Sequence, residues 1–147
     1  MSDPKHAYSQ QEPSIPVLIE RWQNVERVLT NLPPHEREKH WRMSTWGRTT
    51  PCGTIACAAG HCGMDPWFQS QGLRLEPVPE GADDVARFSG RWPGSILPEF
   101  FGDIGHNKIF ADAWPRMVDT VIEEVRDHIA WLQKQQSQQD PAVGAKP

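Results

Sequence analysis

The chain has 147 residues, a size typical of a single domain that buries about two thirds of the surface its unfolded form exposes. Its hydrophobic fraction of 37% is low, but seven Trp and five Phe supply large apolar areas, which argues against disorder throughout the chain. The net charge of -4, with acidic and basic residues interleaved, excludes a nucleic-acid binder held by a basic stripe.

No apolar run reaches the roughly 18 residues of a membrane helix, and the residues after Met1 lack the apolar core of a signal peptide. We therefore expect no membrane partner and a location in the cytoplasm. The three cysteines all lie between positions 52 and 62, too close together to staple a domain. Reduced thiols are the expectation.

The first expected helix spans residues 14–31 and follows a polar segment, 1–13, that we expect to be a mobile tail. Ser14 suits the N-cap and Pro16 the first turn. Apolar residues at spacings of three and four form one stripe: Leu18, Trp22, Val25, Leu29 and Leu32. This stripe needs an apolar partner, which could lie in the same chain or in a second copy as a homodimer.

Shorter elements follow the first helix. Pro34 can open a short helix that continues to Met43. Asp65 followed by proline is typical of an N-cap and predicts another short helix that stops at Gly72. Residues 73–78 alternate between apolar and polar, which predicts an extended segment that its prolines confine to a sheet edge or an isolated hairpin.

The last third of the chain predicts two more short helices and one long one. We expect the short helices at residues 82–88 and 98–102, with Gly90, Pro93 and Gly94 as breakers between them. The long helix spans residues 114–134, and its apolar stripe is Val118, Val121, Ile122, Val125, Ile129 and Leu132. Residues 135–147 are rich in Gln, Pro and Gly, so we expect a mobile tail after a single helical domain at 14–134.

The segment from Cys52 to Cys62 is the most unusual stretch. Small residues crowd a helical window whose expected N-cap is Thr54 and whose expected stop is Gly63. Small side chains let neighbouring elements approach closely. The favoured interpretation is a short central helix on which the Trp-bearing segments pack, with the cysteines acting as small buried hydrophobes.

A zinc site is a second interpretation of the same segment, since thiolates and imidazole are preferred zinc ligands. Cys57 and His61 are four residues apart and share a helix face, while Cys52 could fold back from just before the helix. A further ligand would have to come from His40 or His106. The segment lacks the short Cys-x2-Cys knuckle of structural zinc sites, so we expect filler rather than metal.

A third interpretation makes Cys52 a nucleophile, because a thiol beside a helix N-terminus can have a lowered pKa. His106 or His61 would then serve as the base. Nothing in the sequence fixes that pairing. A small zinc- or thiol-dependent enzyme is therefore the alternative function, and the sequence shows no phosphate-binding loop, dinucleotide fingerprint or serine elbow to support other chemistry.

A second polar cluster lies near the end of the chain, around Gly102 and Gly105: Asp103, His106, Asn107 and Asp112. These side chains could line a pocket. A capped, solvated loop between two helices explains them at least as well, and we expect the loop.

Three motifs carry a resemblance: Met43-Ser44-Thr45-Trp46-Gly47, Cys52-Gly53-Thr54-x-x-Cys57-x-Ala59-Gly60-His61, and Phe100-Phe101-Gly102 with Phe110. Over residues 41–129 the chain resembles a loose set of small uncharacterised proteins from bacteria and their phages. The resemblance implies a Phe-Gly segment and a closing amphipathic helix after the cysteine signature, and it implies no activity. In such proteins a Trp often stands at the position of His61, which argues against a metal ligand there.

We therefore expect a mainly α fold: terminal amphipathic helices packed around a short central helix, with one short β-hairpin or extended segment. The expected function is a non-enzymatic protein-interaction module, since Trp is enriched at binding hot spots. A phage or prophage accessory factor that acts on a host protein would be a module of this kind.

Overall fold

The computed structural model describes residues 13–43, 45–50, 53–110 and 116–139. Its helices are α2 (Ile15–Thr30), α3 (Pro34–Lys39), α4 (Ala58–Gly63), α5 (Pro66–Ser70), α6 (Pro93–Phe101), α7 (Asp103–Gly105), the π-helix η1 (His106–Phe110) and α8 (Val118–Gln139). Its strands are β1 (Arg48–Thr50), β2 (Gly53–Ile55), β3 (Leu75–Glu76), β4 (Val78–Pro79) and β5 (Arg87–Phe88). The prediction of a mainly α small domain is confirmed.

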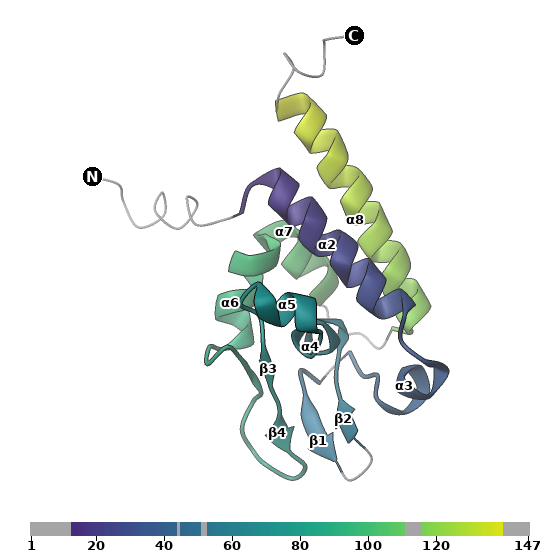
Figure 1. The fold of residues 1–147 in the computed structure, drawn as a ribbon, viewed down its shortest axis with the longest axis vertical. Helices are drawn as coiled ribbons and strands as arrows, with labels where there is room; N and C mark the ends of the chain where they lie inside the picture. The colour runs from purple at the N-terminus through teal and green to yellow at the C-terminus, as the bar shows by residue number, and fades with distance from the viewer. Residues whose placement is uncertain (1–12, 44, 51–52, 111–115, 140–147) are drawn as a thin grey trace, which may run out of the picture.

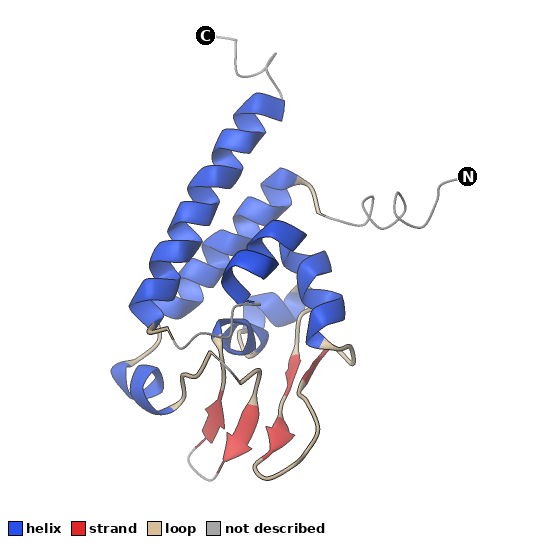
Figure 2. Cartoon of the chain, turned by 180° about the vertical axis from the view of Figure 1, so that it is seen from behind, coloured by secondary structure: helices blue, strands red, loops and turns tan. Residues whose placement is uncertain are grey.

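The two long helices, α2 and α8, lie side by side and antiparallel, as Figures 1 and 2 both show. The apolar stripes that predict their pairing are buried on both helices, and Trp22, Val25 and Leu29 of α2 are fully enclosed. At the surface, Arg126 Nε donates to Glu26 Oε2 at 2.7 Å. An exposed ion pair contributes no more than about 1 kcal/mol, so apolar burial holds the two helices together.

The boundaries of α8 differ from the prediction. The helix continues to Gln139, so the predicted end at residue 134 is wrong. Its polar last turns project past the start of α2, where no apolar stripe is needed (Figure 1). Residues 1–12 of the tail predicted at 1–13, residues 140–147 of the tail predicted at 135–147, and the predicted helix start at 114 lie outside the described residues.

The strands gather at the end of the molecule away from the C-terminal end of α8 (Figure 2). One sheet has the order β2-β1-β4, with β1 antiparallel to β2 and parallel to β4, and β3 pairs with β5 in a second, antiparallel sheet. The extended segment predicted at 73–78 is confirmed in β3 and β4, and β4 with Pro79 does lie at a sheet edge.

Two short-helix predictions need correction. Residues 82–88 form no helix and end in β5, because Phe88 is fully buried and pairs with Leu75 in the second sheet. The helix predicted at 98–102 begins earlier, at Pro93. Pro93 does not act as the predicted breaker, because a proline in the first turn lacks only an N–H that would have no helical partner. The helices that begin at Pro34 and at Pro66 are confirmed, but the first ends at Lys39, so its predicted continuation to Met43 is wrong: Trp41 forms a β-bridge with Ala56 instead.

Candidate functional site

The predicted small-residue helix exists as α4, but it starts later than expected. Thr54 lies in β2, and Cys57 is the N-cap, its sulfur accepting a hydrogen bond from the N–H of Gly60 at 3.5 Å. A tight β1–β2 pair therefore replaces the first turn of the expected helix. Gly63 is the last helical residue, so the predicted stop is confirmed.

Every residue of helix α4 is buried, and Gly60 is the glycine of this helix that lies closest to its neighbours. A Cβ on Gly60 would lie 2.0 Å from the carbonyl oxygen of Trp46 and 2.6 Å from Ala56 Cβ. The segment around Trp46 is itself fixed, because Cys57 N donates to Thr45 O at 2.6 Å. The small residues of this segment thus let a backbone carbonyl rest directly on the helix.

The two described thiols are poor nucleophiles. Cys57 and Cys62 are both free and buried, with exposures of 1% and 0%. Burial raises the pKa of Cys57 to about 11 and raises that of Cys62 well above its ordinary value. At neutral pH both are thiols rather than thiolates, in line with the filler interpretation. Cys52, the predicted nucleophile, lies outside the described residues.

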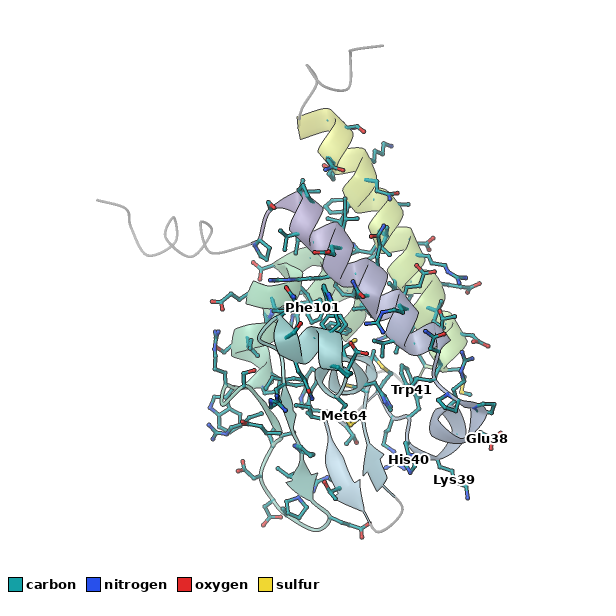
Figure 3. The ribbon with its side chains drawn as sticks, viewed as in Figure 1. Glu38, Lys39, His40, Trp41, Met64 and Phe101 are labelled. Atoms are coloured by element: carbon teal, nitrogen blue, oxygen red, sulfur yellow. The ribbon has the colours of Figure 1, made fainter. Side chains whose placement is uncertain are left out.

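His61 connects α4 to the segment after α3. Its Nε2–H donates to the carbonyl oxygen of His40 at 2.9 Å, and its ring stacks on Trp41 with centroids 5.7 Å apart and planes 13° from parallel. Figure 3 shows His40 and Trp41 side by side beyond α3. The same carbonyl of His40 accepts from Ala56 N at 2.9 Å. These contacts give His61 a structural role at this junction.

The structure gives His61 and His106, two of the candidate zinc ligands, different neighbours. His61 faces His40 and Trp41, whereas His106 lies in η1 with Nδ1 at 3.2 Å from Asn107 Oδ1. Within the described ranges, no group of three His, Cys, Asp or Glu side chains could hold a metal ion. Cys52 falls outside those ranges, so the zinc site stays a prediction.

A pocket of about 330 Å³ lies where the start of α2, the helix α7 and residues 128–135 of α8 meet. Leu18, Phe101 and Leu132 supply apolar walls. Two large apolar side chains at the pocket are exposed, Ile104 by 56% and Trp131 by 36%. Its polar side chains are Asp103, His128 and Gln135. A concave site with apolar walls and few polar groups is typical of ligand binding.

Two glycines shape this pocket. Gly102 ends α6 with a φ of 85° and a ψ of 144°, a conformation that glycine adopts at little cost, and the chain turns there into α7. Gly105 lies against the core, since a Cβ on it would be 2.4 Å from Trp22 Cζ2 and 2.7 Å from His128 Nε2. Phe101, which precedes the turn, is fully buried, and Figure 3 shows it between α2 and α5 in that view.

His128 is the most constrained polar group of the pocket. It is 2% exposed, stacks on Trp131 at 5.6 Å and meets the Trp22 ring edge-on at 5.1 Å. Its Nδ1 is buried and has no hydrogen-bond partner among the described residues. Burial, with the nearby charge of Lys108, lowers the pKa of His128 to about 4, so the imidazole is neutral at pH 7.

The π-helix η1 directly follows α7, which lines the pocket. His106, its first residue, is buried, its Nε2 has no partner in the described chain, and burial lowers its pKa. Segments of π-helix occur frequently at functional sites. Two buried histidines with lowered pKa values therefore lie on adjoining elements at this end of the molecule.

The solvated loop expected around Gly102 and Gly105 is wrong. The chain forms the helices α7 and η1 after Gly102. This segment lines the pocket with Gly102, Asp103 and Gly105, and it is part of the core because Gly105 packs against the Trp22 ring. Asp112 lies outside the described residues. Sequence reasoning also missed His128, although it falls on the apolar face of the last helix between Val125 and Leu132, where a polar residue is a signal.

Comparison with models of protein families, with curated proteins and with solved structures finds no match. None of the helices in the described ranges combines the length and apolarity that crossing a membrane requires.

Proposed function

We propose that the protein is a non-enzymatic protein-binding module that takes up a large side chain of its partner in the pocket between α2, α7 and α8. The observation that carries this proposal is the pair of exposed apolar side chains, Ile104 and Trp131, at a pocket with buried apolar walls. Binding energy at protein interfaces concentrates where such anchors enter desolvated pockets.

The pocket is built to bind without rearranging. Stacking on His128 holds the Trp131 ring, and Gly105 packs on Trp22, so both walls keep their shape in the free protein. Side chains that are already ordered lose little entropy when a partner binds. The volume exceeds the roughly 150 Å³ of an apolar cavity that accepts benzene, which leaves room for one aromatic side chain.

The partner we propose is a host protein, met by a phage or prophage accessory factor in the cytoplasm. The resemblance to small bacterial and phage proteins supports this setting. The two described cysteines are free thiols, as is usual in a reducing compartment.

A selection of random peptides displayed on phage tests the proposed function. The immobilised full chain is the bait, and Ile104→Glu places a charge at the pocket. Met117→Glu is the matched control, because Met117 is 70% exposed and does not line the pocket. Both variants change exposed positions, so we expect the free energy of unfolding to stay within about 0.5 kcal/mol of the wild type.

We expect enriched peptides to bind the wild type and Met117→Glu at least tenfold more tightly than Ile104→Glu. Peptides that bind all three proteins equally would place the interaction elsewhere and refute the role of the pocket. A selection that enriches no peptide would refute the proposed function.

A further inference from the structure

A second pocket, of about 710 Å³, adjoins the start of α2. Val17 and Arg21 of α2 line it together with the turn after α5 and with residues of α6. Pro13 lines both this pocket and the first one, between α2, α7 and α8, and Val17 is followed in the chain by Leu18, which lines the first. A partner bound in the first pocket therefore has the second beside it.

Arg21 is held in position at the second pocket while one edge of its guanidinium stays unused. Nη1 donates to Phe100 O at 2.8 Å, and the guanidinium carbon lies 3.8 Å from the centre of the Phe100 ring. No described residue accepts a hydrogen bond from Nε or Nη2 of Arg21. Neither atom is among the enclosed polar atoms that lack a partner in the described chain, so both are accessible to solvent. The Nε–Nη2 edge can therefore bind a carboxylate through two parallel hydrogen bonds.

The charges that line the second pocket favour an anion. Arg91 donates to Glu99 Oε2 at 2.6 Å, so these two charges offset each other. Arg21 forms no ion pair with any carboxylate of the described ranges. Burial lowers the pKa of Arg21, and its exposed neighbour Glu20 counteracts only part of this effect. The pocket thus presents one positive charge in excess, on a guanidinium that is already partly desolvated.

We propose that the second pocket binds an aspartate or glutamate side chain of the partner, whose carboxylate accepts hydrogen bonds from Nε and Nη2 of Arg21. This inference rests on the proposed function and adds a charged contact to the apolar anchor in the first pocket. A carboxylate with one negative charge matches the single excess charge better than a phosphate with two. Val17 and Ile96 line the same pocket and offer apolar contact to the methylene groups of the acidic side chain.

The peptides selected on the full chain provide the first test. We expect them to share an acidic residue, and we expect its replacement by the corresponding amide to weaken binding to the wild type about tenfold, as for the loss of charged hydrogen bonds. On Arg21→Gln the same replacement should change the affinity less than about twofold. Arg42→Gln is the matched control, since Arg42 is exposed and does not line the pocket, and it should behave as the wild type. Equal losses on the wild type and on Arg21→Gln would overturn the inference.

The side chain of Arg21 gives a second readout that needs neither a peptide nor a variant. N-acetylglutamate N-methylamide carries one carboxylate, and N-acetylglutamine N-methylamide is its neutral counterpart. In titrations of the ¹⁵N-labelled full chain, we expect only the carboxylate to move the Nε resonance of Arg21 saturably, with a smaller effect at high salt, and the Nε resonance of Arg42 to stay in place. An Arg21 resonance that responds to both compounds alike, or to neither, would overturn the inference.

Failure of this inference is separable from failure of the proposed function. Peptides that depend on Ile104 but share no acidic residue would keep the binding module and refute the contact with Arg21. A selection that enriches no peptide would refute a protein as the source of the carboxylate, and the titration would then decide whether Arg21 binds carboxylates at all.

Discussion

Replacing Gly60 with alanine tests whether α4 and the Trp46 segment are packed as the structure shows. The added Cβ would lie 2.0 Å from the carbonyl oxygen of Trp46. Ordinary contact between a carbon and a carbonyl oxygen is at about 3.3 Å, so the two segments must separate by about 1.3 Å. The obstacle is backbone, and neighbouring hydrogen bonds hold it, including Val78 N to Gly47 O at 3.1 Å.

The magnitude follows from this rigidity. An extra methyl group in a packed core costs about 1–3 kcal/mol, and occasionally more where the backbone must move. We expect Gly60→Ala to lie at the upper end, about 3 kcal/mol, despite the better helix propensity of alanine. For a chain of this size that loss lowers Tm by about 6–12 °C.

Urea unfolding followed by tryptophan fluorescence and by far-ultraviolet circular dichroism measures the change. Gly94→Ala is the matched control, because Gly94 also lies in a helix but a Cβ there meets nothing within 4 Å. We expect the control to be neutral or to stabilise the protein by up to about 1 kcal/mol. A loss below about 1 kcal/mol for Gly60→Ala would refute the close approach of α4 to the Trp46 carbonyl.

Three further predictions follow from other parts of the fold. The pKa of His128 is about 4 in the folded protein and about 6.5 in the unfolded chain. The neutral imidazole therefore makes its full contribution to the free energy of unfolding above pH 6.5, and this free energy falls by at most about 3 kcal/mol as the pH decreases toward 4. Unfolding free energies at pH 7, 5.5 and 4 should show a smaller decline in His128→Phe, and equal declines would contradict this. Cys57 and Cys62 should react with iodoacetamide at pH 7.5 only after unfolding by urea, and rapid labelling of the native protein would show that they are accessible. Asp65→Ala should cost about 1–3 kcal/mol in urea unfolding, since Asp65 caps α5 and pairs with Arg27 at 2.9 Å, whereas a loss below about 0.5 kcal/mol would deny both roles.

The sequence predicts the long helices well because their apolar stripes are long and regular. Trp22 and Val25 on one helix, and Val121 and Val125 on the other, fall where a period of 3.6 residues puts them, and all four are fully buried. The start of α5 at Asp65 is equally predictable from the sequence, since an N-cap before proline acts through local hydrogen bonds.

Elements whose structure depends on contacts distant in the sequence cannot be predicted from local patterns. Residues 82–88 resemble a short helix locally, yet pairing of Phe88 with Leu75 determines the structure there. The start of α4 shifts from Thr54 to Cys57 because β1 pairs with residues 53–55. Short strands carry too little periodicity to compete with helix propensity in a sequence-based prediction.

The pocket lies in a different part of the chain from the predicted site, for a related reason. Cysteine and histidine side chains drew attention to residues 52–62, where the described thiols are buried and His61 serves as a structural link. The pocket forms instead around residues that matter for their backbone conformation and close packing, such as Gly102 and Gly105. The positions of glycines in a sequence do not predict where the folded chain forms a pocket.

Trp22 connects the pocket to the core of the fold. Its indole N–H donates to Phe101 O at 3.0 Å, and its ring contacts Phe101 and Phe110 at 5.1 Å each. The same ring meets His128 at 5.1 Å. One buried side chain thus positions the turn at Gly102 and the imidazole together, so the pocket keeps its shape for as long as the core is folded. A partner would then bind to a preformed surface, and affinity differences between anchors would report their chemistry rather than a change in the protein.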